Sequence, residues 1–314
     1  METGTARRVD TLWYEDGNIV FQAGDSLFRL SRGVLARQST VFQDMLAFPQ
    51  PGDETLIDGC PVVQLQDDPK DVEDFFSAIF DSAFFEPPPS HCAFSTVAGI
   101  LRLATKYDIA YLRRRALQHL NLIYPSTTFS WNLRRISGTV PSADLDDIEN
   151  LTTIIALSQQ VDTPWLIPAA MYFLSTRPME VLVAANLSAA LLAQCIILHG
   201  QLRQLEIMSI VCTFGDPVDV LKCTTAEQCR RTRLRCMALI MSEEQVHPLD
   251  PISRRIAGVD PMIRSLCAPC TAELEGDRRR NIDEVWDKLP QLLNLGRWED
   301  VRTHEAERYT NADQ

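Results

Sequence analysis

The spacing between apolar residues differs between the first residues and most of the remaining chain, and this difference limits the fold more than any other feature of the sequence. Before about residue 30, apolar and polar residues alternate between turn signals such as Asp16-Gly17 and Gly24-Asp25, a pattern typical of short strands. Strands are predicted near residues 12–14, 18–23, 27–30 and 62–65. Elsewhere apolar residues recur three or four positions apart, as Val72, Phe75 and Ile79 do, which predicts amphipathic helices. The expected fold class is α+β, with a small sheet and helices in the first part of the chain.

Proline- and serine-rich interruptions divide the chain into four expected parts. A sheet-and-helix domain over residues 10–125 ends at Pro125. An all-α extension covers residues 140–215, with helices predicted at 145–161, 165–175, 179–185 and 188–214. Residues 216–300 form a short cysteine-containing module with one clear helical pattern, at 282–293. The polar residues 301–314 are expected to be a flexible tail.

The charge of the chain argues against nucleic acid as a partner. The net charge is −12, and residues 1–221 carry 26 acidic and 15 basic side chains, a net charge of −11. Nucleic-acid binding normally needs a basic surface that displaces counterions from phosphates. Nucleic acid is therefore not an expected partner.

The longest apolar stretch, Val181–Leu198, approaches the length of a membrane span. It contains Asn186, Ser188 and Gln194, so we interpret it as buried helix and expect no membrane partner. The first residues lack a secretory signal pattern, and the nine cysteines are an odd number. This combination favours free thiols or a metal site over a disulfide framework. The expected location is the cytoplasm, the nucleus or both.

Three stretches that follow one another in order resemble a BTB/POZ domain. The first covers residues 16–46 and includes Val34-Leu35-Ala36-Arg37-Gln38-Ser39. The second joins residues 62–65 to the helix that carries Phe75 and Phe76. The third contains Leu101-x-x-Ala104-x-Lys106-Tyr107-Asp108 and the helix behind it. Leu166-Ile167-Pro168-Ala169-Ala170-Met171-Tyr172 and the cysteine-rich end also resemble a large group of BTB proteins from mushroom-forming fungi, and this resemblance covers nearly the whole chain.

The resemblance implies a BTB/POZ-like N-terminal domain and a non-catalytic scaffold that binds protein partners. BTB domains commonly form dimers by pairing their N-terminal strand and first helices across a two-fold axis. A homodimer or heterodimer of this kind would use Leu12, Trp13, Tyr14, Val34, Leu35, Phe42, Met45 and Leu46. Aromatic residues and Met are enriched at the centres of interfaces. The alternative is that these side chains only complete the core of the monomer.

Two other roles follow from the same resemblance. A substrate adaptor of a cullin-type ubiquitin ligase would contact the cullin through Phe48, although Phe48-Pro49-Gln50 departs from the aromatic-x-Glu pattern of such adaptors. A transcriptional co-regulator would be found in the nucleus.

Four cysteines have a spacing that suits a metal ion. Cys223-x5-Cys229 is followed by Cys267-x2-Cys270, and four thiolates can hold zinc in a tetrahedron. A structural zinc would stabilise a region that is poor in periodic apolar residues. The alternative is four ordinary reduced cysteines, because the five-residue gap is unusual. Reserve ligands are Cys212, Cys236 and His247.

No catalytic signature is found, so an enzyme is not expected. The five histidines are scattered, and the sequence has no Gly-x-Ser-x-Gly elbow, phosphate-binding glycine loop or dinucleotide fingerprint. A cysteine nucleophile that meets a distant histidine only in the folded chain is the rival hypothesis.

Overall fold

The computed structural model describes residues 6–47, 56–137, 147–215, 223–242, 248–249 and 258–303. The strands are β1 (Arg7–Trp13), β2 (Ile19–Ala23), β3 (Ser26–Leu30), β4 (Leu56–Ile57) and β5 (Cys60–Leu65). The first helices are α1 (Arg32–Gln38), α2 (Thr40–Ala47), α3 (Pro69–Phe80), α4 (Phe94–Lys106), α5 (Ala110–Ile123) and α6 (Thr128–Ser137). The later helices are α8 (Ile148–Gln160), the 3-10 turn η1 (Pro164–Leu166), α9 (Ile167–Ser175), α10 (Met179–Ala184), α11 (Ala189–Phe214), α12 (Ala226–Met241), α14 (Val259–Arg264) and α15 (Ala268–Leu292).

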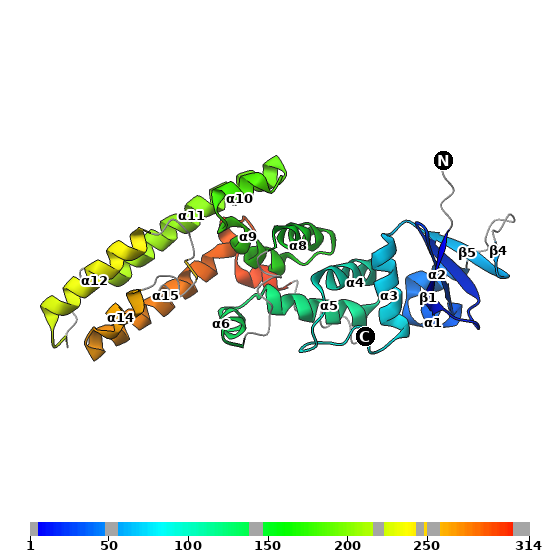
Figure 1. Ribbon diagram of the computed structural model, residues 1–314, viewed down its shortest axis with the longest axis horizontal. Coiled ribbons are helices and arrows are strands. Elements are labelled where there is room, and N and C mark those ends of the chain that lie inside the picture. Colours follow the sequence, from blue (N-terminus) through cyan, green and yellow to red (C-terminus); the bar gives the residue numbers. More distant parts are fainter. Residues whose placement is uncertain are drawn as a thin grey trace.

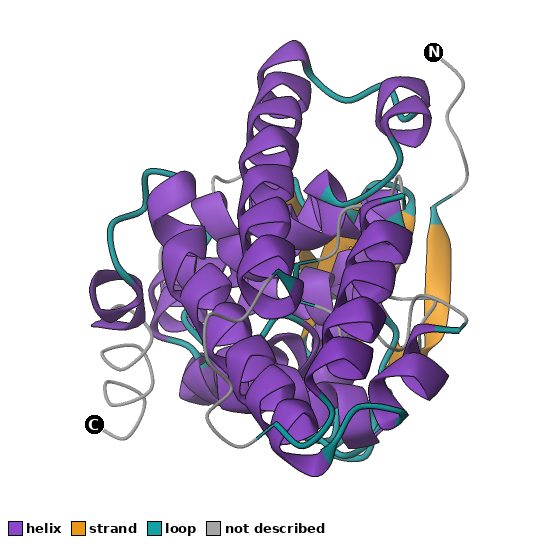
Figure 2. Ribbon diagram, turned by 90° about the vertical axis from the view of Figure 1, so that its left-hand side faces the viewer, coloured by secondary structure: helices purple, strands orange, loops and turns teal. Residues whose placement is uncertain are grey.

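These elements form an elongated molecule of the α+β class, as the sequence predicts. The sheet lies at one end, α3, α4, α5, α8 and α9 form the middle, and α11, α12, α14 and α15 extend to the other end (Figure 1). We call these last four helices the arm. Figure 2 looks along the long axis from the arm end and shows the helices in front of the sheet.

The five strands lie in the order β1-β3-β2-β5-β4. β2 and β3 form an antiparallel hairpin whose turn includes Gly24, with φ of +55°. A Cβ atom at Gly24 would lie 2.9 Å from Pro69 Cγ, so the turn needs glycine for space as well as for its backbone angle. β1 pairs with β3 and β2 pairs with β5, both in parallel. This order places β1 at an edge of the sheet.

Aromatic side chains fill the space between the sheet and the first helices. Phe42 of α2 stacks on Tyr107 with ring centroids 4.6 Å apart, and Phe21 of β2 meets Phe76 of α3 at 5.2 Å. Ser39 caps α2, because its Oγ accepts a hydrogen bond from the Phe42 N–H at 3.0 Å. The same hydroxyl donates to the Tyr107 carbonyl, so the cap also ties α2 to the end of α4.

A second aromatic group joins the C-terminal helix to the middle of the molecule. Trp286 of α15 lies 5.3 Å from Trp131 of α6 and stacks on Trp298 at 5.2 Å, and the Trp298 indole N–H donates to the Trp286 carbonyl at 2.7 Å. These side chains belong to one core cluster that begins in β1 and ends at Val301. The residues predicted as a module at 216–300 therefore divide between this main core and a smaller cluster in the arm. Val301, the first residue of the predicted tail, is buried, and residues 304–314 lie outside the described residues.

Several predicted elements match the structure. The predicted helices at 165–175, 179–185 and 188–214 correspond to η1 with α9, to α10 and to α11. The helix predicted at 145–161 is α8, which begins at Ile148 after the capping residue Asp147; residues 145–146 lie outside the described residues. The predicted order of strands and helices in the first 125 residues is also found, with the two-residue β4 added.

Other predictions were wrong. The helix predicted at 282–293 begins at Ala268, and α6, α12 and α14 were not predicted at all. In α12 the buried positions are Cys229, Arg233, Cys236 and Ile240, so the inward face contains few typical core residues and its period is hidden. β1 extends over residues 7–13 and not 12–14. Its two buried residues, Val9 and Leu12, are three positions apart because the pairing with β3 is irregular between Arg8 and Trp13, so the sequence shows no strand alternation there.

The apolar stretch at 181–198 is not one buried helix. It is divided between α10 and α11, and several of its side chains face solvent: Val181, Val183, Ile196 and Ile197 are 41–63% exposed. Within the described parts of the chain, no helix combines the length and the apolar character required to cross a bilayer.

Candidate metal centre

The four spaced cysteines meet at the N-terminal ends of two helices of the arm, α12 and α15. Cys223 lies just before α12 and Cys229 lies in the first turn of that helix. Cys267 is the N-cap residue of α15 and Cys270 lies in its first turn. Each pair therefore places one thiol before a helix and one inside it, so two helix N-termini point toward the same small volume.

The sulfur positions suit a tetrahedral ion. All four Sγ atoms lie within 4.8 Å of one another, and the Sγ atoms of Cys267 and Cys223 are 3.7 Å apart. Zinc bound at about 2.3 Å from four tetrahedral sulfurs sets those sulfurs about 3.8 Å apart. The arrangement could thus hold a metal ion after movements of about 1 Å or less. The sequence-based grouping of these four residues is confirmed.

Nearby backbone groups favour the thiolate form of Cys267. The backbone N–H groups of Cys270 and Thr224 donate to the Cys267 sulfur and lower the pKa of this thiol to about 6. The Cys267 N–H in turn lies 3.4 Å from the Cys229 sulfur. Burial, followed by the neighbouring thiols, raises the pKa of Cys270. One thiolate of the cluster is therefore present at neutral pH before any metal binds, and metal ligation requires thiolates.

The lowered pKa of Cys267 predicts a measurable pH dependence in metal-free protein. We expect the rate of Cys267 alkylation by iodoacetamide to rise through about pH 6, because the thiolate is the nucleophile. In the urea-unfolded chain, the same rise should occur near the ordinary thiol pKa of about 8.5. Mass spectrometry of the Cys267 peptide at a series of pH values measures both curves. Coincident curves in folded and unfolded protein would contradict the assignment.

Folding lowers the pKa of Cys267 from about 8.5 to about 6. The folded state of the metal-free protein should therefore lose stability as the pH falls from about 8.5 to about 6.

Apolar side chains cover one side of the site. The smaller core cluster comprises Ile210, Phe214, Cys229, Cys236, Ile240, Val259, Ile263, Leu266, Cys270 and Leu274. Cys229 and Cys270 are no more than 2% exposed. Cys223 and Cys267 are half-buried and pack against this cluster. Four sulfur ligands would fill the tetrahedral positions of zinc, which leaves no open coordination position for a substrate.

Two of the reserve ligands, Cys212 and Cys236, do not belong to the four-thiol group. Cys236 is fully buried and its sulfur lies 3.9 Å from Met262 Sδ, whereas Cys212 is exposed on α11. The described thiols that meet are only the four already named. His247 lies outside the described residues.

Arg233, which was not predicted as a functional residue, is buried in the arm at 2% exposure. Its Nη2 donates to the Thr213 carbonyl of α11, and the Thr213 hydroxyl accepts from Asn281 Nδ2 of α15 at 2.8 Å. Arg233 therefore helps to join three helices of the arm. The spacing of Cys229, Arg233 and Cys236 on one helical face was the signal that could have found it.

The residues predicted as an interface divide into two groups. Leu12, Leu35, Phe42 and Leu46 are buried in the main core, as the alternative reading expects. Trp13, Tyr14 and Met45 are half-buried, and Val34 is 38% exposed. Phe48, the predicted cullin contact, lies outside the described residues.

Comparison of the chain with family models, with curated proteins and with solved structures finds no match in any of the three.

Proposed function

We propose that this protein is a non-catalytic protein-interaction scaffold, in which a BTB/POZ-like domain binds another polypeptide and a zinc-stabilised arm extends from it. The observation that carries the proposal is the edge position of β1. An edge strand has unpaired backbone N–H and C=O groups, to which a strand of a partner can add. β1 is also the strand that the BTB/POZ resemblance assigns to dimer formation.

Neighbouring side chains support this surface. Val34 on α1 and Val41 on α2 remain 38% and 37% exposed, although their helices bury Leu35 and Phe42 completely. At the edge itself, the Arg8 guanidinium lies 4.5 Å from the Trp13 ring centroid and forms an ion pair with Asp58 at 3.0 Å. Charged residues on an edge strand disfavour pairing with the strands of unrelated proteins. This edge therefore suits a partner whose own side chains complement these charges.

The role proposed for the metal is structural. The four sulfurs come from two segments about forty residues apart in sequence, so a zinc ion would clamp the start of α12 to the start of α15. Such a clamp would make the arm a rigid extension, because the smaller apolar cluster alone contains few large side chains.

Affinity capture with the full chain tests the scaffold role. We expect Val41→Glu to weaken capture of a partner, or of a second copy, at least tenfold, because the new carboxylate would be buried against the partner. Leu234→Glu on α12 is the matched control, since Leu234 is similarly exposed at 40%. Equal capture by Val41→Glu, Leu234→Glu and the unaltered chain would refute the N-terminal surface as the binding site.

A further inference from the structure

The outward face of α11 is free of charge over its whole length. Its exposed residues are Ala189, Ala190, Ala193, Gln194, Ile196, Ile197, Gly200, Gln204, Met208, Val211 and Cys212. The charged residues of α11 are Arg203 and Glu206, which pair with each other at 3.2 Å, and Glu206 is buried. The outer face of a solvated helix normally carries charged and polar side chains. This face is instead typical of a contact surface.

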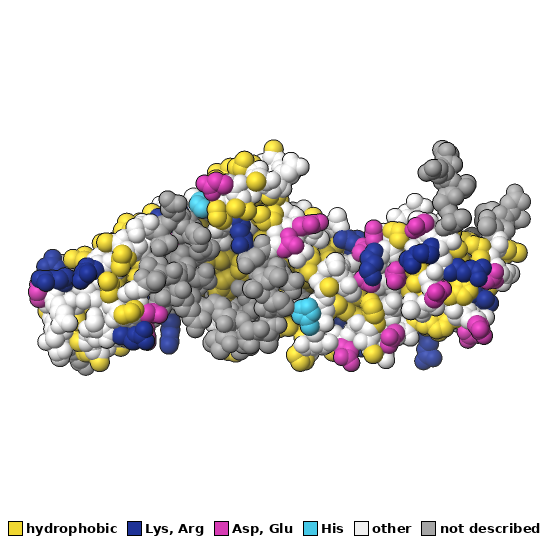
Figure 3. All heavy atoms as spheres, in the orientation of Figure 1, with side chains coloured by type: hydrophobic (Ala, Val, Ile, Leu, Met, Phe, Trp, Pro, Cys, Tyr) yellow, Lys and Arg dark blue, Asp and Glu magenta, His cyan; other side chains and the backbone are white. Residues whose placement is uncertain are grey.

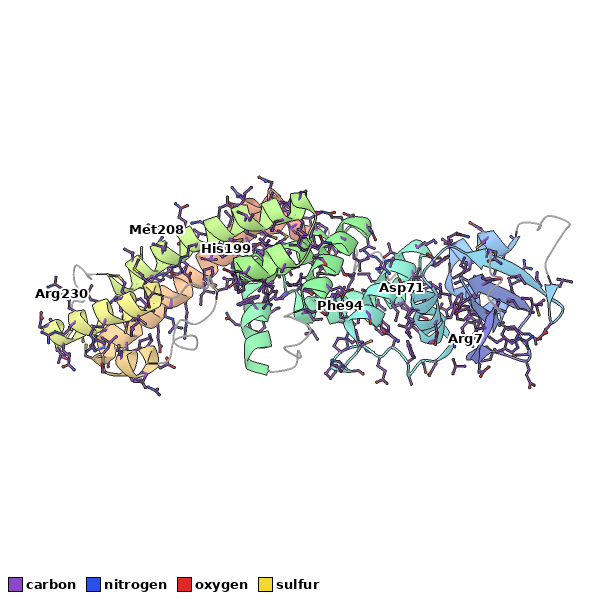
Figure 4. All side chains as sticks on the ribbon, turned by 45° about the horizontal axis from the view of Figure 1, so that its top comes forward. Arg7, Asp71, Phe94, His199, Met208 and Arg230 are labelled. Carbon is purple, nitrogen blue, oxygen red and sulfur yellow. The ribbon has the colours of Figure 1, made fainter. Side chains whose placement is uncertain are left out.

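The opposite face of α11 is already occupied within the chain. Leu198 and Leu202 belong to the main core, and Ile210 and Phe214 belong to the smaller cluster of the arm. His199 Nδ1 also lies 2.8 Å from the Ser175 carbonyl at the end of α9. Figure 3 shows hydrophobic side chains gathered over α10 and the adjoining part of α11, and Figure 4 marks Met208 on the outer edge of the arm.

We infer that this face of α11 binds the same face of a second copy in an antiparallel, two-fold arrangement. The contact row, which we call the α11 seam, consists of Ala193, Ile197, Gly200, Gln204, Met208 and Val211. Successive members are three or four residues apart, so they form one stripe along the helix. Four of the large exposed side chains of this region support it: Ile196, Ile197, Met208 and Val211 are 45–61% exposed.

The order of residues in the seam points to a second copy and not to an unrelated protein. A two-fold axis near residue 202, close to the midpoint of α11, places Ala193 opposite Val211, Gly200 opposite Gln204 and Ile197 near Met208. Two of these pairs set a small residue against a larger one. Such self-complementarity is what an isologous two-fold contact requires.

No contact within a single copy explains why position 200 is glycine. It lies inside a 26-residue helix, where glycine is less favourable than alanine. A Cβ atom at Gly200 would meet nothing within 4 Å, so no contact in this chain requires glycine there. Close approach of another helix does require a small residue, and Gly200 lies beside the inferred axis.

Charge and area agree with this occupant. The chain has a net charge of −12, most of it before residue 222. The sheet lies at the end of the molecule opposite the arm (Figure 1), so antiparallel pairing of two arms would direct the acidic N-terminal domains away from each other. A helix of this length is about 39 Å long and about 10 Å wide, so the contact buries roughly 400 Å2 per copy. Val181 and Val183 on α10 can add to that area. The total approaches the lower limit of about 1,000 Å2 for a specific interface, so we expect a dissociation constant in the micromolar range.

Sedimentation velocity of the full chain over a concentration series tests the inference. We expect Ile197→Glu and Gly200→Leu each to weaken self-association at least tenfold, with thermal stability measured at dilute, monomeric concentrations to confirm that both variants fold. Leu234→Glu, at an exposed position of α12 outside the seam, should associate like the unaltered chain.

Cross-linking tests the direction of the pairing. Mixed Gly200→Cys and Gln204→Cys chains should form a disulfide-linked dimer upon mild oxidation more readily than either variant alone. Preferential linkage within the Gly200→Cys variant alone would overturn the antiparallel register. A chain that stays monomeric at hundreds of micromolar would overturn the inference altogether.

The same measurements separate this surface from the N-terminal one. Self-association that Val41→Glu removes and Ile197→Glu leaves intact would overturn the α11 contact while supporting the scaffold role. Loss of another, co-purified protein upon Ile197→Glu, with unchanged self-association, would show that the seam binds a different partner and would also overturn the inference.

Discussion

Cys270→Ser should remove one bound zinc ion per chain and loosen the arm. Cys270 is 1% exposed and its sulfur lies in the four-thiol cluster, so no water can easily take its place as a ligand. At free zinc one thousand times the dissociation constant, binding to the folded state stabilises a protein by about 4 kcal/mol. We expect a loss of stability of that size, located in α12, α14 and the first half of α15.

Metal analysis by mass spectrometry and amide hydrogen exchange measure the two effects. Cys212→Ser is the matched control, because Cys212 is an exposed thiol outside the cluster on the adjoining helix α11. The unaltered chain and the Cys212→Ser variant should both carry about one zinc. Less than about half an equivalent in unaltered protein purified without chelators, or full occupancy in Cys270→Ser, would rule out a four-sulfur zinc site.

Trp286→Ala should destabilise the whole molecule by about 3–5 kcal/mol. Trp286 is 1% exposed and touches the rings of Trp131 and Trp298, so it holds α15 against α6 and the chain beyond α15. Its removal leaves a cavity at the point where three parts of the chain meet. Urea unfolding monitored by circular dichroism measures the change in free energy.

The matched control for this prediction is Phe129→Ala. Phe129 is also aromatic and lies on α6, the helix that carries Trp131, but it is 76% exposed. An exposed substitution of this kind usually changes stability by no more than about 0.5 kcal/mol. Equal effects of the two substitutions would mean that Trp286 does not join the C-terminal helix to the main core.

Local patterns sufficed where an element buries ordinary apolar residues at a regular spacing. The strand signal of residues 18–23 and the stripe of Val72, Phe75 and Phe76 in α3 each lie within a few residues of sequence. Such signals are read from one segment without knowledge of the others. The resemblance to BTB/POZ domains rests on the same local patterns, and the binding role that it implies stays a prediction.

The tertiary structure alone decided which side chains of a segment face a neighbour. Phe42 and Val41 are adjacent and both apolar, yet one is fully buried against Tyr107 and the other is 37% exposed. Similarly, the apolar sequence of α11 does not reveal that Leu198 faces the core while Ile197 faces outward. The sequence determined the α+β class, most helices and the four candidate ligands, because these depend on composition and spacing. Burial depends on contacts between segments far apart in the chain, such as that between α11 and α15, and only the folded arrangement supplies those contacts.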